Sequence, residues 1–480
     1  PFQALGALSN IEDRFFSVYA NASYTYANRY SLTASFRTDA SNFQSKKSRE
    51  KFSPFWSIGA SWLLSRESFM SGISWIDQLK VRASYGIAGV AAGKSGTSSV
   101  TTLEVWSGFP QYTNNESFNT IATRGNETLT WEKSRTLNIG LDIAMFNHKL
   151  FGSIEFYDKF SYDVLSSATV PVISQGTNKA TFNNAEMLNR GIEFSLGSDL
   201  RIVGDLKWKG TLNYAYNHNE VKKYDLKTSI PAFNPGYVEG YPVDLHFILK
   251  PAGYTSEGFI LLQGKDGTQE AIVDRASSHS LEQIARQDGE TVNDNNWVYY
   301  LGSATPTSNL SFSNQFSWKG LTLSFMITGR FGYYVRPNDA FYDTNSSHYS
   351  KQLDEAFKVY DEGYANQTSY SAFPLYNDAN YETYKGGYGY MYAYNASRNF
   401  RSSFIKGDHV RLNEVYIGYE LPERWLSRQS VFRRVNIYAQ ASNLGILWSA
   451  NKDMDPDYPV GNVKPMPTFT FGLKIGFKNW

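Results

Sequence analysis

Residues 467–480 have the sequence PTFTFGLKIGFKNW, in which apolar and polar side chains alternate. The apolar positions are Phe469, Phe471, Leu473, Ile475 and Phe477. Because successive side chains of a β-strand point to opposite faces, this stretch predicts a strand with one apolar and one polar face. Such a strand at the end of a chain is typical of a membrane β-barrel, whose last strand pairs with its first and leaves no free edge. The last strand of a soluble β-sandwich is the alternative.

The composition favours the membrane alternative. The 480 residues include 34 Tyr, 32 Phe and 11 Trp, and aromatic residues make up 16% of the chain. Tyr and Trp combine an apolar ring with a polar group, which suits the boundary between membrane and water. The chain has no Cys, which excludes a disulfide framework and thiol chemistry. A formal net charge of +1 without a basic block argues against nucleic acid as a partner.

Neither a transmembrane helix nor a signal peptide is predicted. The sequence has no run of about 18 apolar residues, the length at which a helix begins to span a bilayer. The first ten residues, PFQALGALSN, lack the basic and apolar regions of a signal peptide and lie close to a predicted strand. We therefore expect the chain to be a portion of a longer protein.

Period-2 alternation recurs along the chain and predicts about fourteen β-strands, most of them near the length that a tilted strand needs to cross a bilayer. Besides the last strand, the runs are at 15–26, 29–38, 55–64, 78–86, 136–146, 150–158, 192–197, 206–218, 310–318, 321–330, 410–421 and 433–443, with weaker ones at 242–250 and 257–263. Within 410–421, Val410 and Leu412 are out of phase with Val415 and the apolar residues after it. This change of phase predicts a β-bulge.

The links between these runs alternate between short and long. Tight links are expected at Ala27–Asn28, Asn147–His148, Ile202–Gly204 and Lys319–Gly320. Long segments are expected at 39–51, 87–130, 159–189, 219–241, 264–305, 333–407 and 447–465. This alternation is typical of an up-and-down barrel with short periplasmic turns and long extracellular loops, whereas a sandwich uses Greek-key links.

A series of sequence blocks resembles one family of such barrels. The blocks are SYTYANRYSLTASFRTDASN (23–42), FSPFWSIGASWLLSRESFM (52–70), DQLKVRASYGIAG (77–89), LTWEKSRTLNIGLDIAMFNHKLFGSIEFYDK (129–159), NNAEMLNRGIEFSLG (183–197), YYLGSATPTSNLSFSNQFSWKGLTLSFMITGRFG (299–332), HVRLNEVYIGYELPERWL (409–426), NIYAQASNLGILW (436–448) and MDPDYP (454–459). In content and order they resemble the SusC/RagA-like family of TonB-dependent outer-membrane transporters of Bacteroidetes. The block at 129–159 is the most specific match.

The resemblance implies an all-β fold, the C-terminal part of a larger plugged antiparallel transmembrane β-barrel of about 22 strands. Residues 1–480 would then be the C-terminal barrel portion, about fourteen strands, without the plug domain, the TonB box and the first strands. The implied function is active nutrient import across the bacterial outer membrane. The implied partners are a SusD-like surface lipoprotein, the TonB complex acting through the missing plug, and an oligosaccharide or peptide substrate, with a slight preference for glycan.

For the last strand, we expect the apolar face formed by Phe469, Phe471, Leu473, Ile475 and Phe477 to contact outer-membrane lipid. The opposite face, with Thr468, Thr470, Lys474 and Lys478, is expected to line the lumen or its rim. An outward Lys474 would place a charge in the hydrocarbon band, at a cost of about 2–4 kcal/mol near the midplane. By resemblance to other barrels, the aromatic ending is also expected to be the signal for outer-membrane assembly.

No catalytic residue, cofactor or metal site is predicted. The six His residues, at 148, 218, 246, 279, 348 and 409, form no ligand pair, and no hydrolase or phosphate-binding motif is present. Asp455 and Asp457, beside Pro456 and Pro459, are interpreted as turn residues rather than as glycosidase acids. Asp288 and Asp294 in residues 285–303 are not spaced like the ligands of a calcium loop. A soluble, secreted all-β protein that binds or hydrolyses glycans is the alternative function.

The segment 333–400 is the predicted ligand or partner contact. It contains fourteen Tyr residues, and the run GYGYMYAYN contributes Tyr388, Tyr390, Tyr392 and Tyr394 at every second position. Aromatic rings stack on sugar faces or clamp peptides, and Tyr hydroxyls add hydrogen bonds. Packing of the same rings within a long loop or against the partner lipoprotein is the alternative.

Overall fold

The computed structural model describes the greater part of the chain: residues 14–41, 52–91, 102–106, 118–123, 125–126, 128–169, 179–224, 237–254, 260–271, 284–285, 291–292, 298–336, 404–426, 431–452, 454–458 and 463–477. Contacts divide the chain into two compact units. Unit 1 comprises Pro1–Asn147, Ser153–Ile192 and His218–Leu226, and unit 2 comprises His148–Gly152, Glu193–Asn217 and Lys227–Trp480. Among the described residues, no helix is both long and apolar enough to cross a lipid bilayer.

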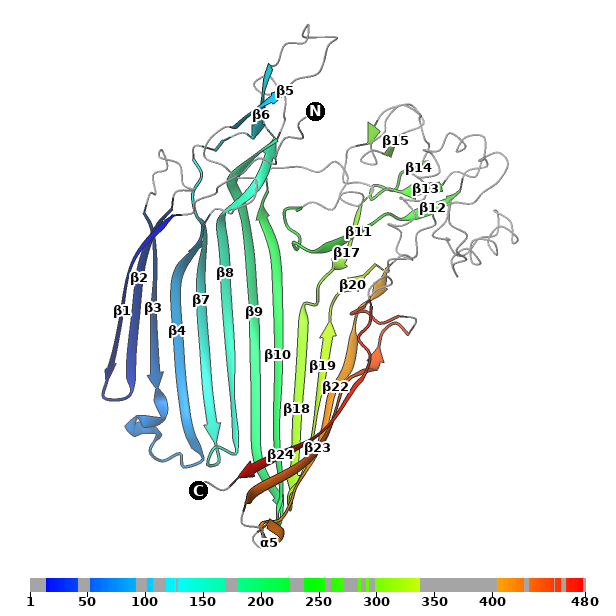
Figure 1. Cartoon of the computed structure of the whole chain (residues 1–480). Helices are drawn as coiled ribbons and strands as arrows, with labels where there is room; N and C mark the ends of the chain where they lie inside the picture. The colour runs from blue at the N-terminus through cyan, green and yellow to red at the C-terminus, as the bar shows by residue number, and fades with distance from the viewer. Residues whose placement is uncertain are drawn as a thin grey trace, which may run out of the picture. The chain divides into compact units, whose positions relative to one another are not determined.

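A sheet of thirteen strands dominates the described part of the chain, in the order β1-β2-β3-β4-β7-β8-β9-β10-β18-β19-β22-β23-β24 (Figure 1). The strands are β1 Phe15–Tyr26, β2 Tyr30–Ser41, β3 Ser53–Leu63, β4 Ile76–Val90, β7 Glu132–Met145, β8 Leu150–Thr169, β9 Lys179–Val203, β10 Leu206–Lys223, β18 Ser308–Trp318, β19 Leu321–Phe331, β22 His409–Glu420, β23 Phe432–Ser449 and β24 Thr468–Phe477. Every clear run of alternation in the sequence corresponds to one of these strands. Neighbours in the sheet are also neighbours in sequence once the small elements are set aside, as in an up-and-down topology.

The remaining strands are short and form small separate sheets. They are β5 Thr102–Trp106 with β6 Phe118–Thr123, β11 Leu245–Ile248 with β17 Tyr299–Ser303, β12 Pro251–Tyr254 with β13 Ile260–Gln263 and β14 Gln269–Ala271, β15 Ile284–Ala285 with β16 Thr291–Val292, and β20 Tyr334–Val335 with β21 Ile405–Lys406. Three short helices are described: η1 Leu64–Arg66, η2 Ser68–Met70 and α5 Glu423–Leu426. The weak runs predicted at 242–250 and 257–263 therefore correspond to β11 and β13, which lie outside the main sheet because four residues are too few to cross a bilayer.

Some strands are longer than predicted. β8 has 20 residues and β9 has 25, so much of the segment 159–189, predicted as a long link, is strand. In the β9 extension at 179–191 apolar and polar residues are mixed on both faces, so period-2 alternation does not mark it as a strand. The β8 extension does alternate, with Phe160, Tyr162 and Val164 at every second position, and the prediction ended this strand too early.

Two of the predicted tight turns have the backbone geometry that two-residue hairpins require, whereas the turn predicted at Asn147–His148 has positive φ at Phe146 as well. Ala27 and Asn28 have φ of 50° and 52°, and Lys319 and Gly320 have φ of 46° and 88°. Positive φ at both central residues is the signature of a type I′ turn, whose twist matches that of the flanking strands. The turn predicted at Ile202–Gly204 begins later, because β9 continues through Val203 and Gly204 takes the positive φ of 52°.

The β-bulge predicted in β22 is present at Asn413. Met326 of β19 pairs with Glu414, whereas the next residue, Ile327, pairs with Leu412, so Asn413 is left without a partner in β19. The extra residue brings Val410 and Leu412 back to the side of Val415. The same shift places His409 and Arg411 on the opposite side, beside Glu414.

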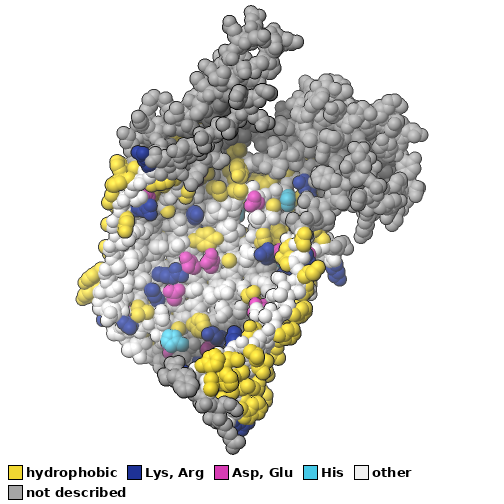
Figure 2. All heavy atoms as spheres, viewed as in Figure 1, with side chains coloured by type: hydrophobic (Ala, Val, Ile, Leu, Met, Phe, Trp, Pro, Cys, Tyr) yellow, Lys and Arg dark blue, Asp and Glu magenta, His cyan; other side chains and the backbone are white. Residues whose placement is uncertain are grey.

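In unit 2 the strand register produces one apolar and one polar face. Leu473 pairs with Ile437, Ile437 with Tyr419 and Tyr419 with Leu321, which forms an apolar row across four strands. On the other face, Thr470 pairs with Gln440, Gln440 with Tyr416 and Tyr416 with Ser324. Figure 2 shows apolar side chains gathered over the lower part of β23 and β24.

Unit 1 repeats this division. Leu32, Ala60, Ala83 and Ile139 pair in sequence across β2, β3, β4 and β7 to form an apolar row. On the polar face Arg82 Nη2 donates to Glu155 Oε2 at 2.6 Å, and Arg82 Nε lies 3.4 Å from Asp142. Acidic and basic side chains lie together on the face that Figure 2 presents.

Candidate functional site

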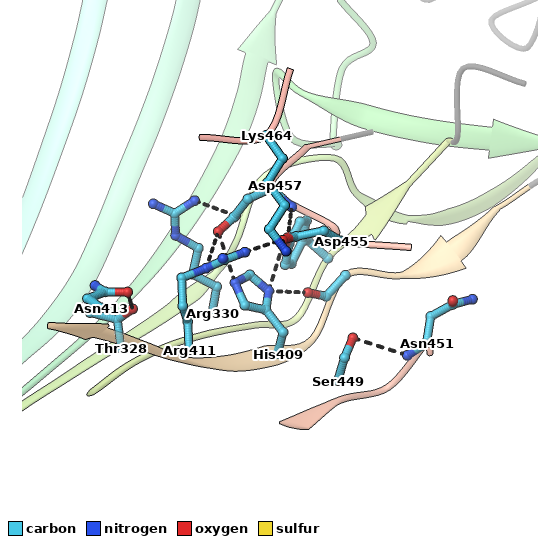
Figure 3. Close-up of polar contacts among 12 residues, drawn as sticks. Thr328, Arg330, His409, Arg411, Asn413, Ser449, Asn451, Asp455, Asp457 and Lys464 are labelled. Carbon is cyan, nitrogen blue, oxygen red and sulfur yellow. Dashed lines mark hydrogen bonds and ion pairs between the residues drawn. The ribbon is translucent and has the colours of Figure 1, made fainter. Parts of the chain in front are cut away.

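Six charged side chains form a compact group in unit 2, at the ends of β19 and β22 that lie away from the tight turn at Lys319 and Gly320 (Figure 3). This group, named the Asp457 cluster below, consists of Arg330, His409, Arg411, Asp455, Asp457 and Lys464. Arg330 is opposite His409 in the register, and Thr328 is opposite Arg411. The bulge at Asn413 is what places His409 and Arg411 on the same polar side as Arg330.

Asp457 is the centre of the cluster. Its Oδ1 accepts a hydrogen bond from Arg330 Nη1 at 2.7 Å. Its Oδ2 accepts from Arg411 Nε and lies beside His409 Nε2, each at 3.2 Å. Three donors from two strands therefore surround one carboxylate that belongs to the segment 454–458.

Asp455 has a second set of contacts. Arg411 Nη2 donates to its Oδ1, and Lys464 Nζ forms an ion pair with its Oδ2 at 3.2 Å. That Oδ2 is buried and accepts no well-aligned hydrogen bond from the described residues, so the contact with Lys464 is electrostatic. The backbone N–H of Asp457 also donates to Asp455 Oδ1 at 3.2 Å, which closes a local turn.

The neighbours of His409 favour its doubly protonated form: burial alone would lower the pKa of the imidazole, but the hydrogen bonds to Asp457 and Gly407 and the charge of Asp457 raise it. The residue is 1% exposed, and its Nδ1 lies 2.8 Å from the carbonyl oxygen of Gly407 and 3.3 Å from the Tyr333 hydroxyl. A carbonyl oxygen only accepts, so Nδ1 carries a proton; the ionised carboxylate of Asp457 also only accepts, so Nε2 carries the other. The contact between His409 and Asp457 is therefore a buried charge-assisted pair.

The electrostatic environment keeps Asp457 ionised. Burial alone would raise the pKa of its carboxyl group, but the hydrogen bond and charge of His409, with the two nearby guanidinium groups, hold this pKa at about 2. Burial raises the pKa of the Tyr333 hydroxyl, and the negative charge of Asp457 raises it further. Tyr333 is therefore a neutral hydrogen-bonding group, not an anion.

The ion pairs of the Asp457 cluster bind the segment 454–458 to the sheet, and the cluster is not arranged to perform a reaction. Every cation of the cluster is paired with a carboxylate, and the cluster contains no Ser, Thr or Cys nucleophile beside a base. The described residues contain no group of three or more His, Cys, Asp and Glu side chains that could hold a metal ion. The interpretation of Asp455 and Asp457 as turn residues therefore covers only part of their role, because both also bind the ends of β19 and β22.

The residues predicted as contacts fall into two groups. Tyr388, Tyr390, Tyr392 and Tyr394 lie outside the described residues, as do Asp288 and Asp294. On β24 the predicted apolar positions are exposed by 45–79% and share one face: Phe469, Phe471, Leu473, Ile475 and Phe477. Lys474 lies on the other face, with its Nζ 4.9 Å from the ring centre of Tyr438. The contact of the apolar face with lipid stays a prediction.

A family model and curated relatives match the chain. The model described as "TonB dependent receptor-like, beta-barrel" matches residues 4–245, half of the chain. The TonB-dependent receptor P26 of Formosa agariphila is 26% identical over 496 aligned positions, which cover 96% of this chain and 46% of the relative. The TonB-dependent receptor SusC of Bacteroides thetaiotaomicron is 24% identical, covering 96% of this chain and 43% of the relative. The chain thus spans less than half the length of these relatives, which are receptors rather than enzymes.

Solved structures share the fold. The RagAB peptide importer in its "open-open" state superposes with a TM-score of 0.71 and 22% identity, covering 98% of this chain and 48% of the other. Its "closed-closed" state gives a TM-score of 0.69 and 21% identity. The large antiparallel sheet described above is therefore similar to the corresponding part of a transporter β-barrel.

Proposed function

The chain belongs to the TonB-dependent receptor-like β-barrel family of the outer membrane, and from this premise we propose that it forms the C-terminal barrel portion of a SusC/RagA-type nutrient importer. The observation that carries the proposal is the division of the sheet into an apolar and a polar face. A barrel wall needs lipid contact outside and water inside, and the row from Leu473 to Leu321 with its polar counterpart supplies both.

The partners follow from the relatives. We infer that a SusD-like lipoprotein covers the extracellular side and that the TonB complex supplies energy through the part of the relatives that this chain does not match. The cargo is an oligosaccharide or a peptide, and of the similar proteins named above the RagAB peptide importer is the one whose name states a cargo. The Asp457 cluster serves this function by holding the segment 454–458 and Lys464 at the end of the wall.

The test uses the full-length protein with its neighbouring lipoprotein, expressed in the outer membrane of a Bacteroidetes host. We expect detergent-dependent extraction, a heat-modifiable band on electrophoresis, co-purification of the lipoprotein, and uptake of labelled oligosaccharide or peptide that stops when TonB is deleted. A full-length protein that stays monodisperse in plain buffer would exclude a membrane barrel. Uptake that is unaffected by loss of TonB would contradict active import.

A further inference from the structure

Residues 64–75, named the β3–β4 link below, fold back against the strand ends of unit 1. The link contains η1 and η2 and lies at the end of the sheet that carries the tight turn between β1 and β2 (Figure 1). Glu67 fastens the link to the sheet, because its Oε1 accepts hydrogen bonds from the Tyr30 hydroxyl at 2.6 Å and from Trp62 Nε1 at 2.9 Å. Its Oε2 accepts from Arg29 Nη1 at 2.9 Å, so three donors hold one carboxylate.

The strand register places the β3–β4 link on the apolar side of the sheet. Tyr30 pairs with Trp62, and the row continues through Val81 to Leu141. Glu67 contacts two side chains of this row and therefore lies on the same side. In the proposed barrel this face is the outer one, away from the lumen and from the plug inside it.

A chain of aromatic rings runs along this end of the apolar face. Tyr26 stacks on Tyr30 and Tyr30 stacks on Trp62, with ring centroids 6.4 and 6.1 Å apart. Phe69 of the link meets Trp62 edge to face, with centroids 6.5 Å apart. Tyr26 and Phe69 are 62% and 65% exposed, and Trp75 at the end of the link is 49% exposed. Aromatic rings gather where a membrane meets water, so this end of the wall corresponds to the periplasmic boundary of the bilayer.

Glu67 takes the role that a lipid headgroup normally has for such rings. At a membrane boundary the Tyr hydroxyl and the Trp N–H reach water or headgroup oxygens, because the rest of each ring is apolar. Here both groups donate to the carboxylate of Glu67, whose side chain is only 11% exposed. The link therefore replaces lipid over Tyr30 and Trp62, and its own outer surface becomes the surface that meets the bilayer.

Arg66 is the cation at that surface. Its side chain is exposed, and Nη1 donates to the carbonyl oxygen of Asn28 at 3.1 Å, but no carboxylate pairs with it among the described residues. Residues 26–30 and 62–75 contain two Arg, one Glu and no other side chain that is charged at pH 7, which gives this surface a net charge of +1. The planar donor groups of a guanidinium match the oxygens of a phosphate.

We propose that the β3–β4 link binds the phosphate headgroup of an inner-leaflet phospholipid through Arg66, with Phe69 against the acyl chains. The inference rests on the proposed membrane barrel and adds a lipid site to it. A phospholipid matches both parts of the surface, because its anionic phosphate lies next to its apolar chains, as Arg66 lies next to the exposed rings. A periplasmic protein is the alternative occupant. Lipid is favoured because the rings continue into the apolar rows that the proposed barrel turns towards the bilayer.

The first test measures lipid binding to the full-length transporter, in complex with its lipoprotein, by native mass spectrometry. The probes are palmitoyl-oleoyl-phosphatidylglycerol and the diacylglycerol with the same chains, which lacks the phosphate. Arg66→Gln removes the charge, while the new amide can still donate to the carbonyl oxygen of Asn28. We expect this variant to raise the apparent Kd for phosphatidylglycerol about fivefold and to leave the Kd for the diacylglycerol unchanged.

Arg201→Gln is the matched control. Arg201 is exposed near the turn end of β9, and the alternation of that strand places it on the face opposite Leu200 and Ile202. The same loss of charge on the polar side is expected to leave phosphatidylglycerol binding as in the parent. Heat-modifiability like that of the parent shows that both variants are folded.

A photo-crosslink identifies the occupant in the membrane itself. Ser68 is exposed between Glu67 and Phe69, and it is replaced by p-benzoylphenylalanine in the full-length protein. Isolated outer membranes are irradiated, and the peptide that contains position 68 is analysed by mass spectrometry. We expect a mass increase equal to that of a phospholipid, with a yield that falls when Arg66→Gln is added.

The outcomes separate the lipid site from the proposed function. If Arg66→Gln binds phosphatidylglycerol as tightly as the parent while membrane insertion and uptake persist, the lipid site is overturned and the proposed function stands. An equal loss of binding in Arg201→Gln would also overturn the site, because the overall positive charge would then explain the binding. A crosslink to a protein would assign the link to a protein partner instead. Absence of membrane insertion in the parent would remove the proposed function itself.

Discussion

The imidazole of His409 and the carboxylate of Asp457 lie 3.2 Å apart, although 48 residues separate them in the sequence. His409 begins β22, and Asp457 belongs to a segment between β23 and β24. Because His409 is buried and Asp457 is only 16% exposed, their pairing is formed away from bulk water. Removing one partner of such a pair leaves a buried charge uncompensated, which costs more than the loss of an exposed ion pair.

Asp457→Asn is therefore expected to release the segment 454–458 from the sheet. The substitution leaves His409 and Arg411 without their shared anion, and we expect local stability to fall by about 2–4 kcal/mol. Hydrogen exchange of residues 404–411 and 454–458 in the full-length protein measures the change. The control is Glu420→Gln, which breaks the exposed pair of Glu420 with Arg434 and should cost less than about 1 kcal/mol. Equal exchange in the two variants would contradict a stabilising role for the cluster.

The pKa of Asp457 also predicts a pH dependence with a definite sign. Folding lowers this pKa from 3.8 to about 2, so the native state favours the ionised carboxylate. The resulting stabilisation, about 2 kcal/mol, is fully present above pH 4 and is lost as the pH falls towards 2. The pair with Asp457 raises the pKa of His409, so the contribution of His409 grows as the pH falls through its ordinary value of 6.5. The difference in local exchange between the parent and Asp457→Asn should therefore grow from pH 7 to 5 and shrink below pH 4, where the Asp457 carboxylate becomes protonated. A difference that stays constant down to pH 2 would show that the carboxylate charge does not matter.

The sequence was sufficient to locate the strands of the main sheet, because each has a two-faced pattern that only a strand presents. It also located the bulge, since Val410 and Leu412 break the phase of β22. It could not reveal the Asp457 cluster, which depends on contacts between residues far apart in the chain. The row of small residues formed by Ser57, Gly86 and Thr136 was equally hidden, because only the strand register aligns them.

Deleting Asn413 should disrupt the wall more than replacing it. Without the bulge, continuous alternation would turn either Arg411 or Val415 to the wrong face, and a charge on the lipid side costs up to about 2–4 kcal/mol depending on depth. Asn413→Ala keeps the extra residue and loses only the 3.3 Å contact with Thr328. We expect the deletion to lower the yield of heat-modifiable, membrane-inserted protein sharply, and Asn413→Ala to resemble the parent. If both variants inserted equally well, the bulge would not set the faces of β22.

A polar contact on the apolar face of unit 2 gives another prediction. Asn314 of β18 is 5% exposed, and its Oδ1 accepts a hydrogen bond from Trp208 Nε1 at 3.0 Å. Trp208→Phe removes the donor and leaves this amide oxygen unsatisfied, so we expect a loss of about 1–3 kcal/mol. The double variant Trp208→Phe with Asn314→Leu removes both polar groups and should recover most of it. The urea midpoints of the detergent-solubilised single and double variants measure the loss of stability and its recovery. If the double variant does not recover stability, Trp208 acts through its volume alone.

The last prediction concerns the two faces of β24. Leu473 is 62% exposed and shares its face with Phe471 and Ile475, whereas Lys474 lies on the opposite face over the ring of Tyr438. If the apolar face contacts lipid, Leu473→Lys places a charge in the hydrocarbon band at a cost of about 2–4 kcal/mol near the midplane, and the yield of folded protein should fall sharply. Lys474→Leu removes a charge from the polar face and loses only one cation–π contact of about 0.5–1 kcal/mol, so it should be tolerated. Both variants are compared in the full-length protein by heat-modifiability in isolated outer membranes. Leu473 and Lys474 are neighbours on β24, so the two variants differ in their yield only if the two faces of the strand meet different environments. Equal amounts of inserted protein from the two variants would therefore show that the assigned faces are wrong.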